Sequence, residues 1–267
     1  MALGGQAKLR VEGLNKTFSL RKADGQVTVT QALKDVSFAV KDHEFVALIG
    51  SSGCGKTTAL KIIHGLIAAD AGSVYVDNRK VDRPGYDRGM VFQHSGLLPW
   101  RTTLENVEFG LELKNVPPQE RRDTALRHLR LVGLDGFEHH YPHQLSGGMQ
   151  QRAGLARALA IDPEILLMDE PFGALDAQTR DTLQKELLRI YQETRKTILF
   201  VTHDLDEAVY LADRVIVMAS RPGRVKEEVK IELPRPRADK LLIQGEKEYL
   251  DKRLYIWQSL QAGLPRG

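Results

Sequence analysis

The segment GSSGCGKT, Gly50 to Thr57, carries the clearest chemistry in the sequence. It matches the pattern G-x-x-x-x-G-K-[ST] in full, and it stands between a strand-like apolar run and a segment predicted to be helical. Glycines there let backbone N–H groups surround a polyphosphate, which Lys56 can reach while the Thr57 hydroxyl ligates Mg²⁺. The alternative is an ordinary glycine-rich turn. The residues expected to hold phosphate are Gly50, Ser51, Ser52, Gly53, Cys54, Gly55, Lys56, Thr57 and Thr58.

Three other strand-like runs end in polar residues. In ILLMDEP, Asp169 and Glu170 follow the apolar run, TILFVTHD contains His203 after its apolar run, and VFQHS contains Gln93. The carboxyl end of a buried strand is where α/β proteins bind ligands, so Asp169 can help to hold Mg²⁺ and Glu170 can polarise a water molecule. Plainer interpretations exist, because acids also terminate strands and a single histidine at a strand end is more often structural.

The stretch LSGGMQQR predicts a second anion site. Ser146 is a good N-cap for the helical run that follows, and Gly147 and Gly148 allow a close approach to the backbone. A helix start with bare N–H groups attracts anions. The sequence therefore predicts two phosphate sites on one chain.

The pattern around these motifs predicts an α/β fold. Residues 8–18 and 27–48 are rich in Val, Phe and Thr and indicate strands. Residues 102–160 are almost entirely helical in pattern, and Thr102 and Glu105 have the spacing of a capping box. Strand-like and helix-like runs then alternate, which implies a parallel sheet covered by helices.

Composition excludes several classes of protein. The 267 residues are 42% hydrophobic and 27% charged, with a net charge of +3, which is too small to argue for nucleic acid. A single cysteine, Cys54, rules out an intrachain disulfide. We find no signal-peptide pattern and no apolar run long enough to span a membrane, so we expect a soluble, cytoplasmic chain. The cluster HHYPH and the basic segment RPRADK are interpreted as a loop and a solvated tail.

At this point the residues resemble the ATP-binding cassette (ABC) ATPases from about residue 8 to residue 225. The motifs occur in the family's order: the phosphate loop, Gln93, the signature LSGGMQQR, ILLMDE, GALD and His203. The resemblance implies a P-loop NTPase with a mostly parallel RecA-like core sheet, an N-terminal antiparallel β-subdomain and a helical subdomain over about 102–160. The cassette would span 1–233, and 234–267 would be a short tail with a possible helix.

The resemblance also implies the roles of individual residues. Two copies would pack head to tail, so that Ser146, Gly147 and Gly148 bind the γ-phosphate of ATP held by the other copy. Glu170 would activate water, His203 would contact the γ-phosphate, and Gln93 would help to hold Mg²⁺ and the water. Asp176 would bridge to the second copy. Phe18 is the best match to the aromatic residue that stacks on adenine, since stacking requires only a ring face.

Details within the family favour a membrane importer. HSGLLPW after Gln93 and MASRPGRV resemble the nitrate, sulfonate and taurine importer group. That resemblance implies a peripheral ATPase at the cytoplasmic face of the inner membrane, with separate permease subunits, a solute-binding protein and no nucleic acid. The alternatives are a soluble ABC ATPase without a membrane partner and a regulatory cassette that does not hydrolyse ATP.

Overall fold

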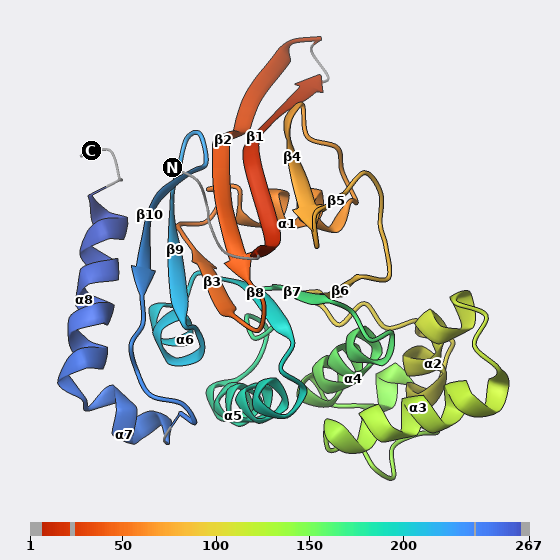
Figure 1. The fold of residues 1–267 in the computed structure, drawn as a ribbon. Helices are drawn as coiled ribbons and strands as arrows, with labels where there is room; N and C mark the ends of the chain where they lie inside the picture. The colour runs from red at the N-terminus through yellow and green to blue at the C-terminus, as the bar shows by residue number, and fades with distance from the viewer. Residues whose placement is uncertain (1–6, 22–24, 238, 263–267) are drawn as a thin grey trace. The chain divides into compact units, whose positions relative to one another are not determined.

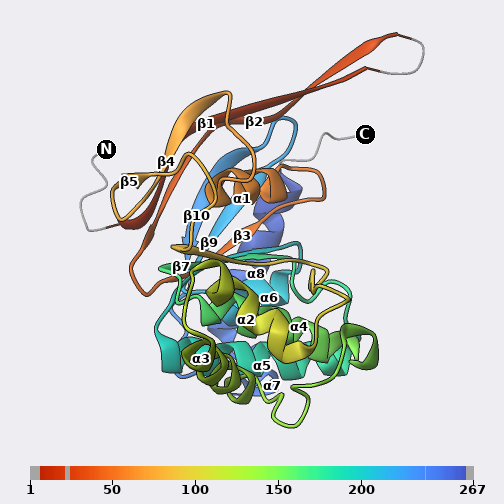
Figure 2. The same cartoon turned by 90° about the vertical axis from the view of Figure 1, so that its right-hand side faces the viewer.

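The computed structural model describes residues 7–21, 25–237 and 239–262. The chain divides into two compact units: Met1–Gly85 with Thr197–Gly267, and Tyr86–Lys196. Each unit holds part of the chemistry predicted from the sequence (Figures 1 and 2).

An antiparallel sheet occupies the N-terminal part of the first unit. Its order is β2-β1-β4-β5, and its strands are β1 (Ala7–Arg21), β2 (Val27–Lys41), β4 (Ala71–Val76) and β5 (Arg79–Lys80). Alternate apolar residues such as Val36, Phe38 and Val40 are buried, as expected of a sheet with one covered face. The far ends of β1 and β2 form a long ribbon (Figure 2).

A second group of strands in this unit carries the phosphate loop. Its order is β10-β9-β3-β8, and its members are β3 (Phe45–Ile49), β8 (Thr197–Thr202), β9 (Arg214–Ala219) and β10 (Arg224–Lys230). β3 pairs in parallel with both β8 and β9. Every residue of β3 and β8 is buried, which explains their continuous apolar sequence. Helices α1 (Lys56–His64) and α6 (Leu205–Leu211) follow β3 and β8.

The C-terminal segment of the first unit contains α7 (Lys240–Gln244) and α8 (Lys247–Gln261). The expectation that RPRADK is a solvated tail is wrong for its arginines. Arg235 donates to Asp213 and to the Leu211 carbonyl oxygen, and the buried Arg237 donates to the Ala212 carbonyl oxygen. Sequence composition did not reveal these partners, because they are backbone oxygens and a carboxylate from a distant segment.

The second unit pairs two parallel strands with a set of helices. β6 (Arg88–Val91) pairs with β7 (Ile165–Asp169). The helices are α2 (Thr103–Leu113), α3 (Pro118–Leu131), η1 (Pro142–Gln144), α4 (Gly147–Ala160) and α5 (Ala177–Thr194). The predicted capping box at the start of α2 is confirmed, with Thr102 and Glu105 bonded reciprocally. Within the residues described, no helix is both long and apolar enough to cross a membrane.

Candidate functional site: a phosphate loop, a signature helix and their supports

The phosphate loop links β3 to α1, as the sequence predicted. Gly53 and Gly55 have φ angles of 76° and 96°, a region that side chains with a Cβ rarely adopt. A Cβ on Gly55 would also lie 2.6 Å from Leu33 Cδ2 and 2.8 Å from the Ala32 carbonyl oxygen. Both glycines are therefore required by the backbone of the loop.

Lys56 is held over the centre of this loop. Its side chain is only 4% exposed, and Nζ donates to the carbonyl oxygens of Gly50 at 2.8 Å and Ser51 at 3.3 Å. These bonds fix the ammonium beside the backbone that the sequence predicted to surround phosphate. A positive charge enclosed by a glycine-rich turn at a helix start fits a polyphosphate.

The segment between β9 and β10 supports the loop from outside. Gly223 donates to the Ala32 carbonyl oxygen at 3.0 Å and accepts from the Lys34 N–H at 2.9 Å. A Cβ on Gly223 would lie 2.1 Å from the Cys54 carbonyl oxygen. Sequence reasoning used MASRPGRV only as a family likeness and missed this contact. The glycine within it was the available signal, because close backbone approach often requires glycine.

His203 emerges at the same sheet edge as the phosphate loop. β3 and β8 are parallel neighbours with Ile49 opposite Thr202. Gly50 and His203 are therefore the first residues after the ends of two adjacent strands. The turn that carries His203 is held on both sides. Thr202 Oγ1 donates to Glu207 Oε2 at 2.6 Å, and the Asp204 N–H donates to Thr202 Oγ1 at 3.0 Å.

Phe18 lies on the ribbon that passes the phosphate loop. It pairs with Thr30 of β2, two residues before Ala32, which touches the loop at Gly55. At about 3.3 Å per residue, that places its strand position roughly 7 Å along the ribbon from the contact. The ring is 44% exposed, with Lys16 Nζ 5.5 Å from its centroid.

In the second unit, Asp169, Glu170 and Gln93 lie at or just beyond the ends of neighbouring parallel strands. Val91 of β6 lies opposite Met168 of β7, so the segments that carry these polar residues leave the same edge. Asp169 is 8% exposed, whereas Gln93 is exposed. A Cβ on Gly173 would lie 3.4 Å from both Gln93 Nε2 and the Glu170 carbonyl oxygen. The Gln93 side chain and the Glu170 backbone therefore both lie beside Gly173.

Glu170 has an unusual backbone. Its φ is 45°, in the left-handed region that few residues other than glycine adopt. Such a conformation costs roughly 1–3 kcal/mol and is concentrated at functional sites. Eight other non-glycine residues among those described also have a positive φ, so this angle alone does not separate a chemical role from the termination of a strand.

The signature segment forms the start of α4. Ser146 is the N-cap, and its Oγ accepts from the Met149 N–H at 3.3 Å, as predicted. A Cβ on Gly148 would lie 2.5 Å from Thr179 Cγ2 of α5. Gly148 is thus needed for helix packing, a reason that the sequence did not reveal. Asp176 is the N-cap of α5, and hydrogen bonds from the Thr179 hydroxyl and N–H lower the pKa of its carboxyl.

Side chains of α4 also form hydrogen bonds to the backbone around Gln93. Gln151 Nε2 donates to the Phe92 carbonyl oxygen at 2.9 Å. Arg157 donates to the carbonyl oxygens of Ser95 at 2.9 Å and Gly96 at 2.8 Å. The helix that begins with the signature therefore fixes the backbone on both sides of Gln93.

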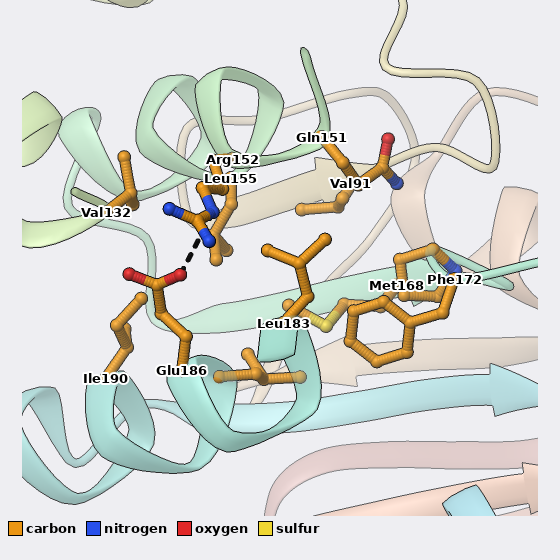
Figure 3. A pocket seen from close by; sticks show the side chains of 12 residues that line it. Val91, Val132, Gln151, Arg152, Leu155, Met168, Phe172, Leu183, Glu186 and Ile190 are labelled. Atoms are coloured by element: carbon orange, nitrogen blue, oxygen red, sulfur yellow. Dashed lines mark ion pairs between the residues drawn. The ribbon is translucent and has the colours of Figure 1, made fainter. Parts of the chain in front are cut away.

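A small pocket lies between α4 and α5 (Figure 3). Across it Arg152 Nε meets Glu186 Oε2 at 3.1 Å, and burial raises the pKa of Glu186 despite Arg152 and Arg189 nearby. The walls are otherwise mostly apolar, so the pocket does not suit a nucleotide phosphate. Its lining is Val91, Val132, Gln151, Arg152, Leu155, Met168, Pro171, Phe172, Leu183, Glu186, Leu187 and Ile190.

The strand, glycine-rich loop and helix around Lys56 are typical of a P-loop nucleotide-binding protein, and comparison with known proteins identifies the family. The family model described as ABC transporter matches residues 33–173. The chain belongs to the ABC transporter family, as an ATP-binding, ATP-hydrolysing subunit. The predicted P-loop α/β fold is confirmed by the same comparisons.

Three relatives illustrate the similarity. An uncharacterized ABC transporter ATP-binding protein of Methanocaldococcus jannaschii is 56% identical over 232 residues, or 87% of this chain and 85% of that protein. The taurine import ATP-binding protein TauB of Yersinia pseudotuberculosis is 48% identical, over 84% of this chain and 89% of its own. The nitrate import ATP-binding protein NrtD of a Synechocystis species is also 48% identical, over 85% and 83%.

A solved structure matches the fold. The ATP-binding cassette MJ0796, described as dimeric in a post-hydrolysis state with bound ADP and Pi, is 37% identical with a TM-score of 0.73. The match covers 84% of this chain and 99% of that one. The predicted resemblance to ABC ATP-binding subunits of the nitrate and taurine importer group is confirmed.

Proposed function

We propose that this chain powers a membrane importer for a small anion such as nitrate, a sulfonate or taurine. One observation carries most weight: a chain with an intact phosphate loop and signature is 48% identical to proteins named for taurine import and for nitrate import. The segment MASRPGRV, whose likeness to this importer group was noted in the sequence, packs against the phosphate loop at Gly223. The chain would be a peripheral subunit at the cytoplasmic face of the inner membrane.

Hydrolysis is an in-line attack of water on the γ-phosphorus of ATP, which requires positioning and charge neutralisation more than covalent chemistry. Lys56 neutralises the terminal phosphates, and the backbone N–H groups of Gly50 to Thr58 hold them. Glu170 takes or orients the proton of the attacking water, and His203 contacts the γ-phosphate. Phe18 stacks on adenine with its exposed ring face.

Mg²⁺ prefers oxygen ligands, and we assign to it the Thr57 hydroxyl, the Gln93 amide and the Asp169 carboxylate, which would hold it together with ATP. When bound with ATP, it would neutralise charge on the phosphates. Gln93 would also couple the ATP site to the permease. Its segment is held to α4 by Gln151 and Arg157.

The second phosphate site implies two copies of the chain. Ser146, Gly147 and Gly148 of one copy bind the γ-phosphate of ATP on the phosphate loop of the other, and Asp176 bridges between them. The dimeric state described for MJ0796 supports this arrangement. Each ATP is then enclosed only when two copies meet, so ATP binding does mechanical work on attached permease subunits.

The test is reconstitution with native partners. The chain is purified from its own membranes, and the permease and solute-binding protein that accompany it are identified by mass. The complex is placed in proteoliposomes with taurine, an alkanesulfonate or nitrate. We expect uptake of one of these anions that requires ATP and the binding protein. A dimer that carries no membrane protein, and hydrolyses ATP at a rate indifferent to all three anions, would favour a soluble ABC ATPase.

A further inference from the structure

Helix α8 is anchored to the start of α6 (Figure 1). Tyr249 Oη donates to Asp206 Oδ1 at 2.7 Å, and Arg253 Nε donates to the same oxygen at 2.7 Å. Tyr249 is 1% exposed. Burial would raise the pKa of the Asp206 carboxyl, but the hydrogen bonds from Arg253 and Tyr249 hold it below its ordinary value. The carboxylate is therefore a fixed, charged anchor.

The anchor lies three residues after His203. The N–H groups of Asp206 and Glu207 donate to Asp204 Oδ1 at 2.8 and 3.1 Å, so Asp204 caps α6. Glu207 in turn accepts from Thr202 Oγ1. A short chain of hydrogen bonds thus joins α8 to both residues that flank His203.

The C-terminal segment also holds the other end of α6. Arg235 donates to the Leu211 carbonyl oxygen, and Arg237 donates to the Ala212 carbonyl oxygen, both at 2.7 Å. Helix α6 has only seven residues, and helices that short are not stable by themselves. Contacts at both ends therefore determine where α6, and the turn before it, can lie.

The far end of α8 reaches the phosphate loop. Ser259 and Leu260 line a small cavity together with Ser51 and Ser220. This end is fixed on β10, because Lys226 donates to the Ser259 carbonyl oxygen and both Ser259 Oγ and Tyr255 Oη bond to Glu227. The bonds at this end join α8 to β10 and involve no residue of the turn that carries His203.

We propose that the C-terminal helix α8 is a brace that positions His203 for ATP hydrolysis, with Tyr249 and Arg253 as positioning residues that act through Asp206. The inference rests on the proposed role of His203 at the γ-phosphate. The bonds converge on the first turn of α6, next to His203, where a shift of the backbone moves the imidazole. Tyr249 and Arg253 touch no nucleotide themselves.

The chain offers a matched pair of substitutions for the test. Tyr249→Phe removes a phenol hydroxyl bonded to Asp206, and Tyr255→Phe removes one bonded to Glu227 at 2.6 Å from the same helix. We expect Tyr249→Phe to lower kcat for ATP about tenfold, the change given by loss of one charge-assisted bond, while KM stays within about twofold. Tyr255→Phe should leave both kcat and KM for ATP unchanged. Arg253→Met should lower kcat, and Arg253→Lys should restore part of it.

A double-mutant cycle with His203→Ala identifies the route of the effect. If Tyr249 acts through His203, Tyr249→Phe should change the residual rate of His203→Ala by less than about twofold. The brace would be overturned by any of three results: a full effect of Tyr249→Phe on the rate of His203→Ala, equal losses of kcat in Tyr249→Phe and Tyr255→Phe, or an unchanged kcat in Tyr249→Phe. An undiminished rate in His203→Ala alone would instead contradict the proposed role of His203.

A readout independent of turnover completes the test. The NMR signal of the His203 ring, assigned by its loss in His203→Ala, should shift in Tyr249→Phe and stay in place in Tyr255→Phe. Thermal unfolding of both variants shows whether the helix remains folded. A His203 signal unmoved by Tyr249→Phe would refute the brace whatever the rates show.

Discussion

The contact between Gly223 and the phosphate loop gives a quantitative prediction for Gly223→Ala. The new Cβ would start 2.1 Å from the Cys54 carbonyl oxygen and 2.7 Å from the Ala32 carbonyl oxygen. An ordinary contact needs about 3.4 Å, so the loop and the β9–β10 segment must separate by roughly 1 Å. Overpacking of this kind costs about 1–3 kcal/mol of unfolding free energy. A displacement of about 1 Å in groups that hold a substrate weakens their function by up to about a hundredfold.

The expected loss is measured by nucleotide-linked stability. At a nucleotide concentration of 100 times the wild-type Kd, ligand binding stabilises the wild type by about 2.7 kcal/mol. If Gly223→Ala raises Kd about a hundredfold, the same concentration stabilises the variant by only about 0.4 kcal/mol. The assay is thermal unfolding with and without ATP, with Kd measured separately by calorimetry.

Gly245→Ala is the matched control. Gly245 has a φ of −83°, and a Cβ there would lie 3.4 Å from its nearest neighbour, the Leu242 carbonyl oxygen. We expect its ATP affinity to equal that of the wild type. A Gly223→Ala variant with wild-type affinity for ATP would refute the view that this loop supports the phosphate loop.

Three further predictions concern single side chains. Glu170→Gln should nearly abolish hydrolysis while ATP still binds, as measured by phosphate release and by calorimetry; wild-type turnover would remove Glu170 from the mechanism. Arg157→Leu leaves two carbonyl oxygens near Gln93 without their donor, so it should lower the unfolding free energy by about 2–4 kcal/mol, as measured by urea titration. An unchanged unfolding free energy would contradict the stabilising role of these bonds. The pKa of Asp206 lies below its ordinary value of 3.8, so its pairing stabilises the fold above about pH 4 and is lost as the pH falls. The difference in Tm between the wild type and Asp206→Asn should therefore stay constant down to about pH 4 and shrink below it, and a constant difference at every pH would exclude the ionised pairing.

The sequence predicted the local loop and helix starts of this protein better than the long-range contacts that hold them in place. Features that depend on residues close together in the chain could be predicted from local patterns. They are the phosphate loop, the N-cap at Ser146 and the capping box at Thr102. By contrast, the packing of Gly148 against Thr179 and of Gly223 against Cys54 depends on distant segments. No local pattern records such contacts.

The C-terminal segment shows the same limit. Strand β10 and helix α7 were not predicted, because RVKEEVK alternates weakly and KLLIQ is too short for a helical period. Arg235 and Arg237 looked like solvated charges because Pro and Arg in a tail usually are. Their actual partners, carbonyl oxygens at the end of α6, are invisible in composition.

The shared ATP site is tested most directly by the mass of Glu170→Gln in solution. With Mg²⁺ and ATP, sedimentation should give twice the chain mass of 29.9 kDa, and with ADP it should give the mass of a single chain. Adding Ser146→Arg to the same chain should leave it monomeric with ATP, although each copy still binds nucleotide. A Glu170→Gln chain that stays monomeric with ATP, or a double variant that still dimerises, would contradict the pairing of one copy's phosphate loop with the other copy's signature.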